Sequence, residues 1–259
     1  MANEDLYRDV VLDEFKIRPV DNTRTSSCIK ISLLEWIYQN ATESDKPYRL
    51  PSEVDLANAL GISRTGLRAA LAQLEGEGYI TRRKNVGTLV NPRMARCRTR
   101  MDLQTEISSL IADQGYEATY KVLSIELKDG HREKLAPEEN KYLEVAKLHY
   151  ADGIPAIYCV DRIAGSIVGN DEANFKLFEH MNLYDFMKSF VRVQNAYSFS
   201  DVSCEQASAE MANFMNIAEN APLMHLSNVN YDMDHVPYMD SDIFIRTEII
   251  KLSLLRRPI

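Results

Sequence analysis

The sequence predicts an α+β protein in two parts: a small helical module that ends in a β-hairpin, and a larger module built on an antiparallel sheet. Three observations support this fold class. Helical periodicity dominates from residue 26 to about residue 75, and two short extended runs follow up to residue 90. Beyond about residue 105, six strand-like runs alternate with fewer helical patterns. The 259 residues are enough for two domains of ordinary size.

Composition and patterning divide the chain into four segments. Residues 1–25 form a polar arm, 26–92 a winged helix-turn-helix domain, 93–104 a basic linker without a clear period, and 105–259 an effector-binding and dimerisation domain. No apolar run approaches the roughly 20 residues that cross a bilayer. The N-terminus also lacks the basic and apolar stretches of a signal peptide, so we expect a cytoplasmic protein.

Two short helices follow a proline-containing loop. Ser52 is placed to cap the first, Asp55 completes a capping box, and Gly61 is expected to end that helix. Ser63 is placed to cap the second, which is expected to reach about Glu75. Two extended runs joined by a tight turn come next and predict a hairpin. Two helices around a glycine turn, followed by a hairpin, are typical of a helix-turn-helix with a wing.

The helix from residue 64 to about residue 75 has two chemically distinct faces. At 100° per residue, Arg64, Thr65 and Arg68 cluster on one side, and Leu67 and Leu71 lie on the other. Arginine can pair bidentately with guanine, and threonine can contact a phosphate or a thymine methyl group. A helix that is buried on one side and offers these groups on the other suits the major groove of DNA.

Charge is distributed unevenly along the chain. The net charge is −8, yet residues 46–100 contain eleven Lys and Arg against four acidic residues, a local charge of +7 that leaves −15 for the rest. A basic module on an acidic body can bind phosphates locally. On charge alone, a solvated basic surface remains an equally good interpretation.

Four motifs within residues 26–92 carry a family resemblance: YRLPSE (48–53), LGISRTGLR (60–68), LEGEGYI (74–80) and GTLV (87–90). They resemble the GntR family of bacterial regulators. The resemblance implies contact with operator DNA by the following residues: Arg49, Ser52, Ser63, Arg64, Thr65, Arg68, Lys84, Asn85, Gly87 and Thr88. Two positions depart from the family pattern. An arginine usually follows Pro-Ser-Glu, where this chain has Val54, and the usual wing cation is replaced by Val86, so an altered operator is expected.

The second domain more weakly resembles the UTRA (HutC-type) ligand-sensing domain, which implies a chorismate-lyase-like fold over about residues 103–255. The residues that carry the resemblance are Gly115, the run KLHYADGIP (147–155), Tyr231, Asp232, Pro237 and Arg246. The candidate effector-binding residues are Ser108, Lys147, His149, Tyr158, Asp240, Ser241 and Arg246.

The effector expected from these residues is a small anion, for which a phosphorylated sugar is one candidate. Lys147 and His149 flank Leu148 on a strand and therefore project from one face. Binding should strengthen as the pH falls through the imidazole range, because a protonated His149 adds positive charge. The alternative is that these residues form internal salt bridges with acids such as Asp240 or Glu144. The family's sugar-contacting carboxylates are missing, with Cys159 standing at one of their positions, which disfavours an amino-sugar phosphate.

The function predicted from these patterns is a sequence-specific transcriptional regulator, a repressor that acts as a homodimer and responds to a small anionic metabolite. One recognition helix reads only a few base pairs, so a two-fold pair is expected on a near-palindromic operator. One alternative is a ligand-independent regulator whose second domain only dimerises. An enzyme of lyase-like fold is the other, disfavoured because no nucleophile–base motif or phosphate loop occurs. No metal site or cofactor is expected, since residues 232–235 (DMDH) are interpreted as a turn.

Overall fold

The structure is a computed structural model. It describes residues 8–9, 26–40, 46–97, 99–103, 106–169 and 195–256, together with Phe175, Phe186 and Val193. The chain divides into two compact units, the first comprising Met1–Arg98 with Leu255–Ile259 and the second Thr99–Leu254. Among the described residues, no helix is long and apolar enough to span a membrane.

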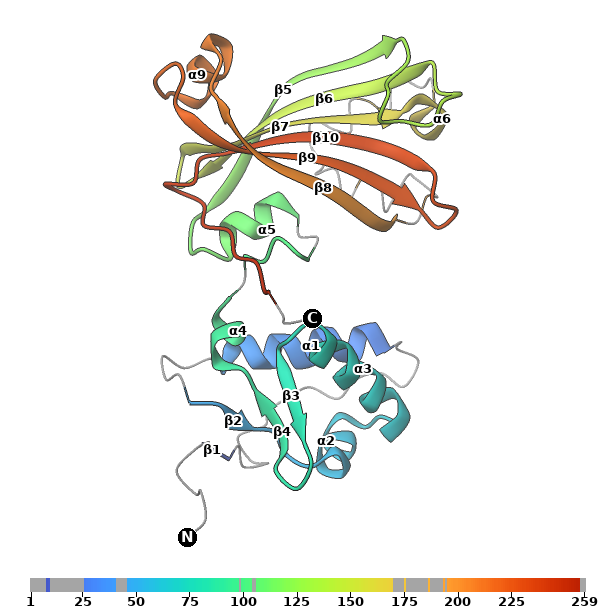
Figure 1. Ribbon diagram of the computed structural model, residues 1–259, viewed down its shortest axis with the longest axis vertical. Coiled ribbons are helices and arrows are strands. Elements are labelled where there is room, and N and C mark those ends of the chain that lie inside the picture. The colour runs from blue at the N-terminus through green and yellow to red at the C-terminus, as the bar shows by residue number, and fades with distance from the viewer. Residues whose placement is uncertain are drawn as a thin grey trace. The chain divides into compact units, whose positions relative to one another are not determined.

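The first unit is a helical bundle edged by a small sheet (Figure 1). Its elements are β1 (Arg8–Asp9), α1 (Ser26–Gln39), β2 (Tyr48–Arg49), α2 (Glu53–Leu60), α3 (Arg64–Gly76), β3 (Ile80–Arg83), β4 (Gly87–Val90) and α4 (Pro92–Arg96). The sheet order is β1-β2-β4-β3, with β1 parallel to β2 and β3 antiparallel to β4.

Local signals in the sequence explain the ends of these helices. The Ser52 hydroxyl accepts a hydrogen bond from the amide of Asp55 at 3.2 Å, and Gly61 ends α2 with a left-handed φ of 66°. Ser63 caps α3 by accepting from the amide of Gly66 at 3.1 Å. The predicted caps at Ser52 and Ser63 and the end at Gly61 are therefore confirmed, whereas the Asp55 carboxylate accepts from the Ser52 hydroxyl at 2.6 Å and not from its amide as a capping box requires.

Two segments of this unit differ from expectation. Residues 1–25 were predicted to be an arm without regular structure, yet they include the strand β1. Residues 93–104 were predicted to be an aperiodic linker, yet α4 covers the start of this stretch. Asn91 caps α4 and Pro92 occupies its first turn, a pattern that favours a helix start and that the count of basic residues obscured.

The second unit is a six-stranded antiparallel sheet with the order β5-β6-β7-β10-β9-β8. Its elements are α5 (Ile107–Ala112), β5 (Ala118–Asp129), β6 (Lys141–Ala151), β7 (Ile154–Ala164), α6 (Gly165–Val168), β8 (Asn195–Gln206), α9 (Ala209–Met215), β9 (Pro222–Asp232) and β10 (Pro237–Ile245). All six predicted strands are present. The sequence pattern predicts the last of them at Asp242–Leu255, whereas β10 begins five residues earlier and ends at Ile245. The apolar pattern of residues 183–190 also predicts a helix, and this segment lies outside the described residues apart from Phe186.

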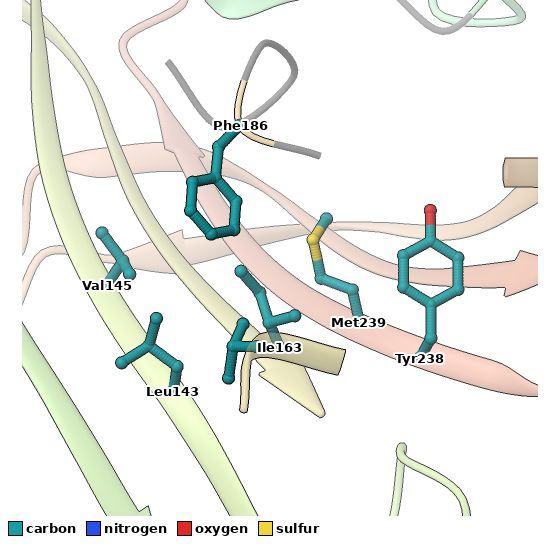
Figure 2. Packing of buried hydrophobic residues seen from close by; sticks show 7 residues of the cluster. Leu143, Val145, Ile163, Phe186, Tyr238 and Met239 are labelled. Carbon is teal, nitrogen blue, oxygen red and sulfur yellow. The ribbon is translucent and has the colours of Figure 1, made fainter. Parts of the chain in front are cut away.

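The two faces of this sheet carry different residues, because side chains alternate along each strand. We call one the α5 face; it carries the apolar clusters around Ile163 and Ile157, the latter packed against Ile111 of α5. Figure 2 shows the ring of Phe186 pointing toward the cluster around Ile163. We call the opposite side the α9 face, where Leu148 packs against Met215 of α9.

A glycine at the start of α6 generates a stability prediction. A Cβ atom added at Gly165 would lie 2.9 Å from both the carbonyl oxygen and the Cβ of Lys141, too close for any L-residue without movement of the backbone. Gly165→Ala is therefore expected to lower the free energy of unfolding by about 1–3 kcal/mol, the usual cost of overpacking.

The matched control is Gly76→Ala in α3, where an added Cβ would have nothing within 4 Å. Removing a helical glycine should leave stability unchanged or raise it by about 0.5–1 kcal/mol. Differential scanning calorimetry of both variants tests the pair, and equal shifts in Tm would contradict the predicted clash.

Candidate nucleic-acid interface and effector site

The N-terminal half of α3 presents an exposed polar surface. Arg64, Thr65 and Arg68 are all exposed, whereas Leu67 and Leu71 on the opposite side are fully buried. The predicted division of this helix into two faces is confirmed. Ser63, the N-cap, lies at the same end, so the free amide groups of the first turn belong to this surface as well.

Arg68 is held in position by a neighbouring helix. Its Nε donates to Oε2 of Glu53 at 2.7 Å, and 58% of the Arg68 side chain remains exposed. Surface ion pairs of this kind contribute about 1 kcal/mol or less. The pairing can therefore orient the guanidinium between α2 and α3 and still be exchanged for a contact with DNA.

The wing carries exposed cations beside its turn. Arg83 and Lys84 are exposed, and Asn85 adopts a left-handed φ of 63° in the turn, where the amide of Val86 donates to the carbonyl of Arg83 at 3.1 Å. Asparagine tolerates this backbone region better than most residues, which explains how the hairpin closes without the usual glycine. The turn predicted for residues 84–87 is confirmed.

Other predicted residues lie at the base of the wing. A groove there is lined by Arg49, Ser52, Lys84 and Gly87, among others. Arg49 is half-buried, and its Cδ would lie 3.4 Å from a Cβ placed at Gly87. Thr88, by contrast, is only 9% exposed, so its side chain belongs to the interior of the wing more than to its surface.

The structure brings together only part of the predicted effector set. Lys147, His149 and Ser241 lie on the α5 face with exposures of 2%, 4% and 2%. Asp161 was not among the predicted residues, although it is 5% exposed on the same face and accepts a hydrogen bond from the Ser241 hydroxyl at 2.6 Å. Its place two residues after Cys159 on one strand was the available signal, because alternate residues share a face.

Three predicted residues lie elsewhere. Tyr158 lies on the α9 face, where its ring stacks on Phe244 with the centroids 6.0 Å apart. Asp240 is fully buried on that same face. Arg246 follows the end of β10 and donates to the carbonyl of Pro155 at 2.9 Å and to Glu248 at 2.7 Å. The predicted seven-residue pocket is therefore wrong as a single site, since strand alternation separates its members.

Ser108 is half-buried in the first turn of α5. This helix has six residues and is capped by Glu106, whose carboxylate accepts from the amide of Ser109 at 2.9 Å. The Glu106 carboxylate thus already pairs with a free amide of the first turn and would repel a second negative charge, which makes this helix start poorly suited to an anion.

Burial sets the protonation behaviour on the α5 face. Burial, aided by the positive charge of Lys147, lowers the pKa of His149 to about 3, so the imidazole is neutral at physiological pH. Protonation of His149 in the imidazole range is therefore not expected, so the predicted gain in binding at lower pH loses its physical basis. Burial also lowers the pKa of Lys147 and raises that of Asp161. The Nδ1 atom of His149 is buried and has no hydrogen-bond partner among the described residues.

The α9 face holds an ion network centred on Arg162. Its guanidinium donates to Glu144 at 2.8 Å, to Asp240 at 3.0 Å and to Asp242 at 2.7 Å, and Arg132 also donates to Asp240. The acids that the alternative interpretation paired with Lys147 and His149 therefore belong to this network on the opposite face.

A tight turn joins β9 to β10. The Asp232 carboxylate accepts from the amides of Asp234 and Val236, both at 2.9 Å, and His235 has a left-handed φ of 62°. The turn expected at residues 232–235 is present.

The Arg162 network generates a prediction for stability against pH. Burial opposes ionisation of Glu144 and Asp242, but the hydrogen bonds that each accepts outweigh it and leave both pKa values lowered. Stability from a lowered carboxyl pKa is present above the ordinary value and is lost as the pH falls through the lowered one. Arg162→Met should cost about 1.5–3 kcal/mol at neutral pH, because it removes the cation shared by three carboxylates and leaves the fully buried Asp240 with Arg132 alone among the described cations. This deficit should shrink below about pH 4.

Urea unfolding of wild type and variant between pH 3 and pH 8 measures this difference. Lys141→Met is the control, since Lys141 forms only an exposed 3.5 Å pair with Asp129 and should change stability by at most about 1 kcal/mol. A deficit for Arg162→Met that stayed constant across the range would contradict the electrostatic explanation.

Two family models match this chain. The model of the UTRA domain matches residues 113–250, and the model described as bacterial regulatory proteins, gntR family, matches residues 26–90. The HTH-type transcriptional repressor NagR of Bacillus subtilis is 24% identical over 188 residues, which cover 70% of this chain and 74% of that protein. The probable transcriptional regulator PhnF of Escherichia coli is 25% identical over 216 residues, which cover 79% of this chain and 85% of that protein.

Two solved structures share the fold. The possible transcriptional regulator YydK from Bacillus subtilis superposes with a TM-score of 0.69 at 16% identity, covering 90% of this chain and 99% of that one. PhnF from Mycobacterium smegmatis superposes with a TM-score of 0.54 at 18% identity, covering 88% of this chain and 99% of that one. With the UTRA model matching more than half of the residues and the helix-turn-helix model matching the first unit, the chain belongs to the GntR family of bacterial regulators that carry a UTRA domain.

Proposed function

We propose that the chain is a transcriptional repressor that binds operator DNA through α3 and the wing and releases it when a small effector binds on the α5 face. The observation that carries the DNA-binding part is the exposed polar surface of α3. Arg64 and Arg68 supply the donors that guanine accepts, and Thr65 lies between them. Lys84 and Asn85 of the wing extend this surface toward the phosphate backbone.

Buried polar groups on the α5 face support effector control over the ligand-independent alternative. A domain that served only for dimerisation would gain nothing from the buried polar side chains of His149 and Asn228, because each buried polar group costs free energy unless it is paired. His149 and Asn228 each keep a buried polar atom without a partner among the described residues. A bound effector would supply partners, with an anionic group placed against Lys147.

No enzymatic role is proposed. Ser203, His225 and Asp242 do form a chain of hydrogen bonds on the α9 face, of 3.3 and 2.9 Å. However, Asp242 also accepts from Arg162 at 2.7 Å, which commits its charge to the ion network and leaves it a poor partner for an activated imidazole.

A homodimer through β8 fits the two edges of the second sheet. β8 lies at one edge, contains no Lys or Arg, and exposes Phe199 (61%) and Val202 (53%). β5 lies at the other edge, where a register shift near Val122 and charged side chains such as Glu126 protect it from pairing. A second copy that pairs along β8 would cover the exposed apolar residues and continue the sheet.

The DNA-binding part generates the next prediction. Arg64→Ala and Arg68→Ala are each expected to weaken specific operator binding by at least about tenfold, since a bidentate base contact contributes roughly 1–3 kcal/mol. Gel-shift titration against genomic operator fragments measures the affinity, and circular dichroism confirms that the fold is kept. Lys121→Ala, an exposed cation in the second unit, is the charge-matched control. Unchanged affinity in both arginine variants would rule out this use of α3.

The proposed dimer interface along β8 generates a further prediction. Phe199→Lys should place a charge on the exposed edge strand β8 and turn a dimer into a monomer at micromolar concentration, as measured by multi-angle light scattering. Leu127→Lys on β5 is the matched control and should remain dimeric. A wild-type monomer would contradict the homodimer, and a monomer only in the Leu127 variant would assign the interface to the other edge.

A further inference from the structure

The buried polar residues of the α5 face form one group between two apolar clusters. On β7, Asp161 lies between Ile157 and Ile163, which belong to separate clusters; on β10, Ser241 lies between Met239 and Ile245 in the same way. Apolar residues at these middle positions would let the clusters merge. We call the polar group of the α5 face the polar row; it comprises Lys147, Asp161, Asn228, Asn230 and Ser241.

The polar row carries one positive and one negative charge. Lys147 and Asp161 lie on neighbouring strands, two residues apart in register, because Lys147 stands opposite Cys159. Strand spacings of about 4.8 Å and 3.4 Å per residue place their Cα atoms roughly 8 Å apart. A third charge, on Glu106 at the start of α5, is near enough to Lys147 to oppose the lowering of its pKa. Among the described residues, the polar row and the start of α5 therefore hold no excess of positive charge.

This balance disfavours a dianionic ligand. A phosphate monoester brings up to two negative charges, and the buried imidazole of His149, with its pKa near 3, cannot contribute a compensating cation. Burying a charge without a partner costs several kcal/mol. Lys147 can pair with one anionic group, whereas Asp161 would repel a second.

The other end of the row requires a donor. The Oδ1 atom of Asn228 is buried without a donor among the described residues, and Asn228 stands opposite Ser241, which itself donates to Asp161. An ammonium group offers three donors and a positive charge. One such group placed here would satisfy Asn228 and compensate Asp161 together.

We propose that the effector is a small zwitterion whose anionic group pairs with Lys147 and whose ammonium group pairs with Asp161 and Asn228. The inference rests on the proposed function, in which the α5 face holds the effector. The spacing of the two charged side chains suits a molecule the size of an amino acid. A zwitterionic effector would not be a phosphosugar, which was one of the candidates expected from the sequence alone.

The test is a binding panel on the full-length protein. The probes are the proteinogenic amino acids and γ-aminobutyrate, each with its decarboxylated amine and its deaminated acid, together with glucose 6-phosphate, glucosamine 6-phosphate and inorganic phosphate. Differential scanning fluorimetry finds binders by mass action, and isothermal titration measures their affinities. At least one zwitterion should bind, and its amine-only and acid-only analogues should each bind at least about tenfold more weakly.

Two variants assign the ends of the ligand. Asp161→Asn keeps the shape and can still accept from Ser241, but it should weaken the zwitterion at least about tenfold and leave the acid-only analogue unchanged. Lys147→Met should also weaken binding of the zwitterion, but it should leave the affinity for the amine-only analogue unchanged. Asp201→Asn and Lys121→Met change exposed residues of the same sheet and are the controls, with no change expected. The Tm of each variant without ligand checks that it folds.

The outcomes separate this inference from the proposed function. Three results would contradict the assignment of the effector as a zwitterion: tightest binding by a phosphate ester, an unchanged affinity of Asp161→Asn for the zwitterion, or no binding by any zwitterion. If in those cases a purely anionic probe binds and Lys147→Met weakens it, control by an effector on the α5 face stands. If no probe in the panel binds and none releases the protein from operator DNA, the proposed effector control fails as well.

Discussion

Side-chain alternation across the six-stranded sheet is the constraint on which the second unit depends. Each strand sends alternate residues to the α5 face and the α9 face, so one strand can serve two unlike environments. On β7, Asp161 belongs to the polar row of the α5 face, whereas the next residue, Arg162, belongs to the ion network of the α9 face. The two side chains therefore have separate sets of partners. The same alternation keeps Asp240 and Ser241 apart although they are adjacent in the chain.

The first unit could be predicted almost completely because its signals are local. A serine that caps a helix, a glycine that ends one and the leucines that share a helix face lie within a few residues of one another, so periodicity and capping chemistry suffice. The ion pair of Arg68 with Glu53 spans fifteen residues and two helices, and no local pattern indicates it. The short helix α4 was missed for a different reason: its five residues are too few to show a period.

In the second unit, the strands could be predicted from the sequence but the site could not. Its six strands were predicted, since each has its own pattern, but the site depends on which strands are neighbours and in what register. β7 pairs with β10, some eighty residues later in the chain, and only this pairing brings Ser241 to Asp161. Arg246 illustrates the same limit: a lone charge near a strand was expected to find an acid such as Asp240, yet the strand ends at Ile245 and the guanidinium turns to the carbonyl groups of Pro155 and Met215.

Within the second unit, the residues that lead into its first helix and those that end its chain are joined. The amide of Met101 donates to the carbonyl of Ser253 at 2.8 Å, and the amide of Ser253 donates back to Thr99 at 2.9 Å. Two residues earlier, the amide of Lys251 donates to Gln114, just beyond the end of α5, at 2.7 Å. Because Ile111 of α5 also packs in the apolar cluster that contains Ile157 of β7, α5 connects the sheet to the segment where this unit begins.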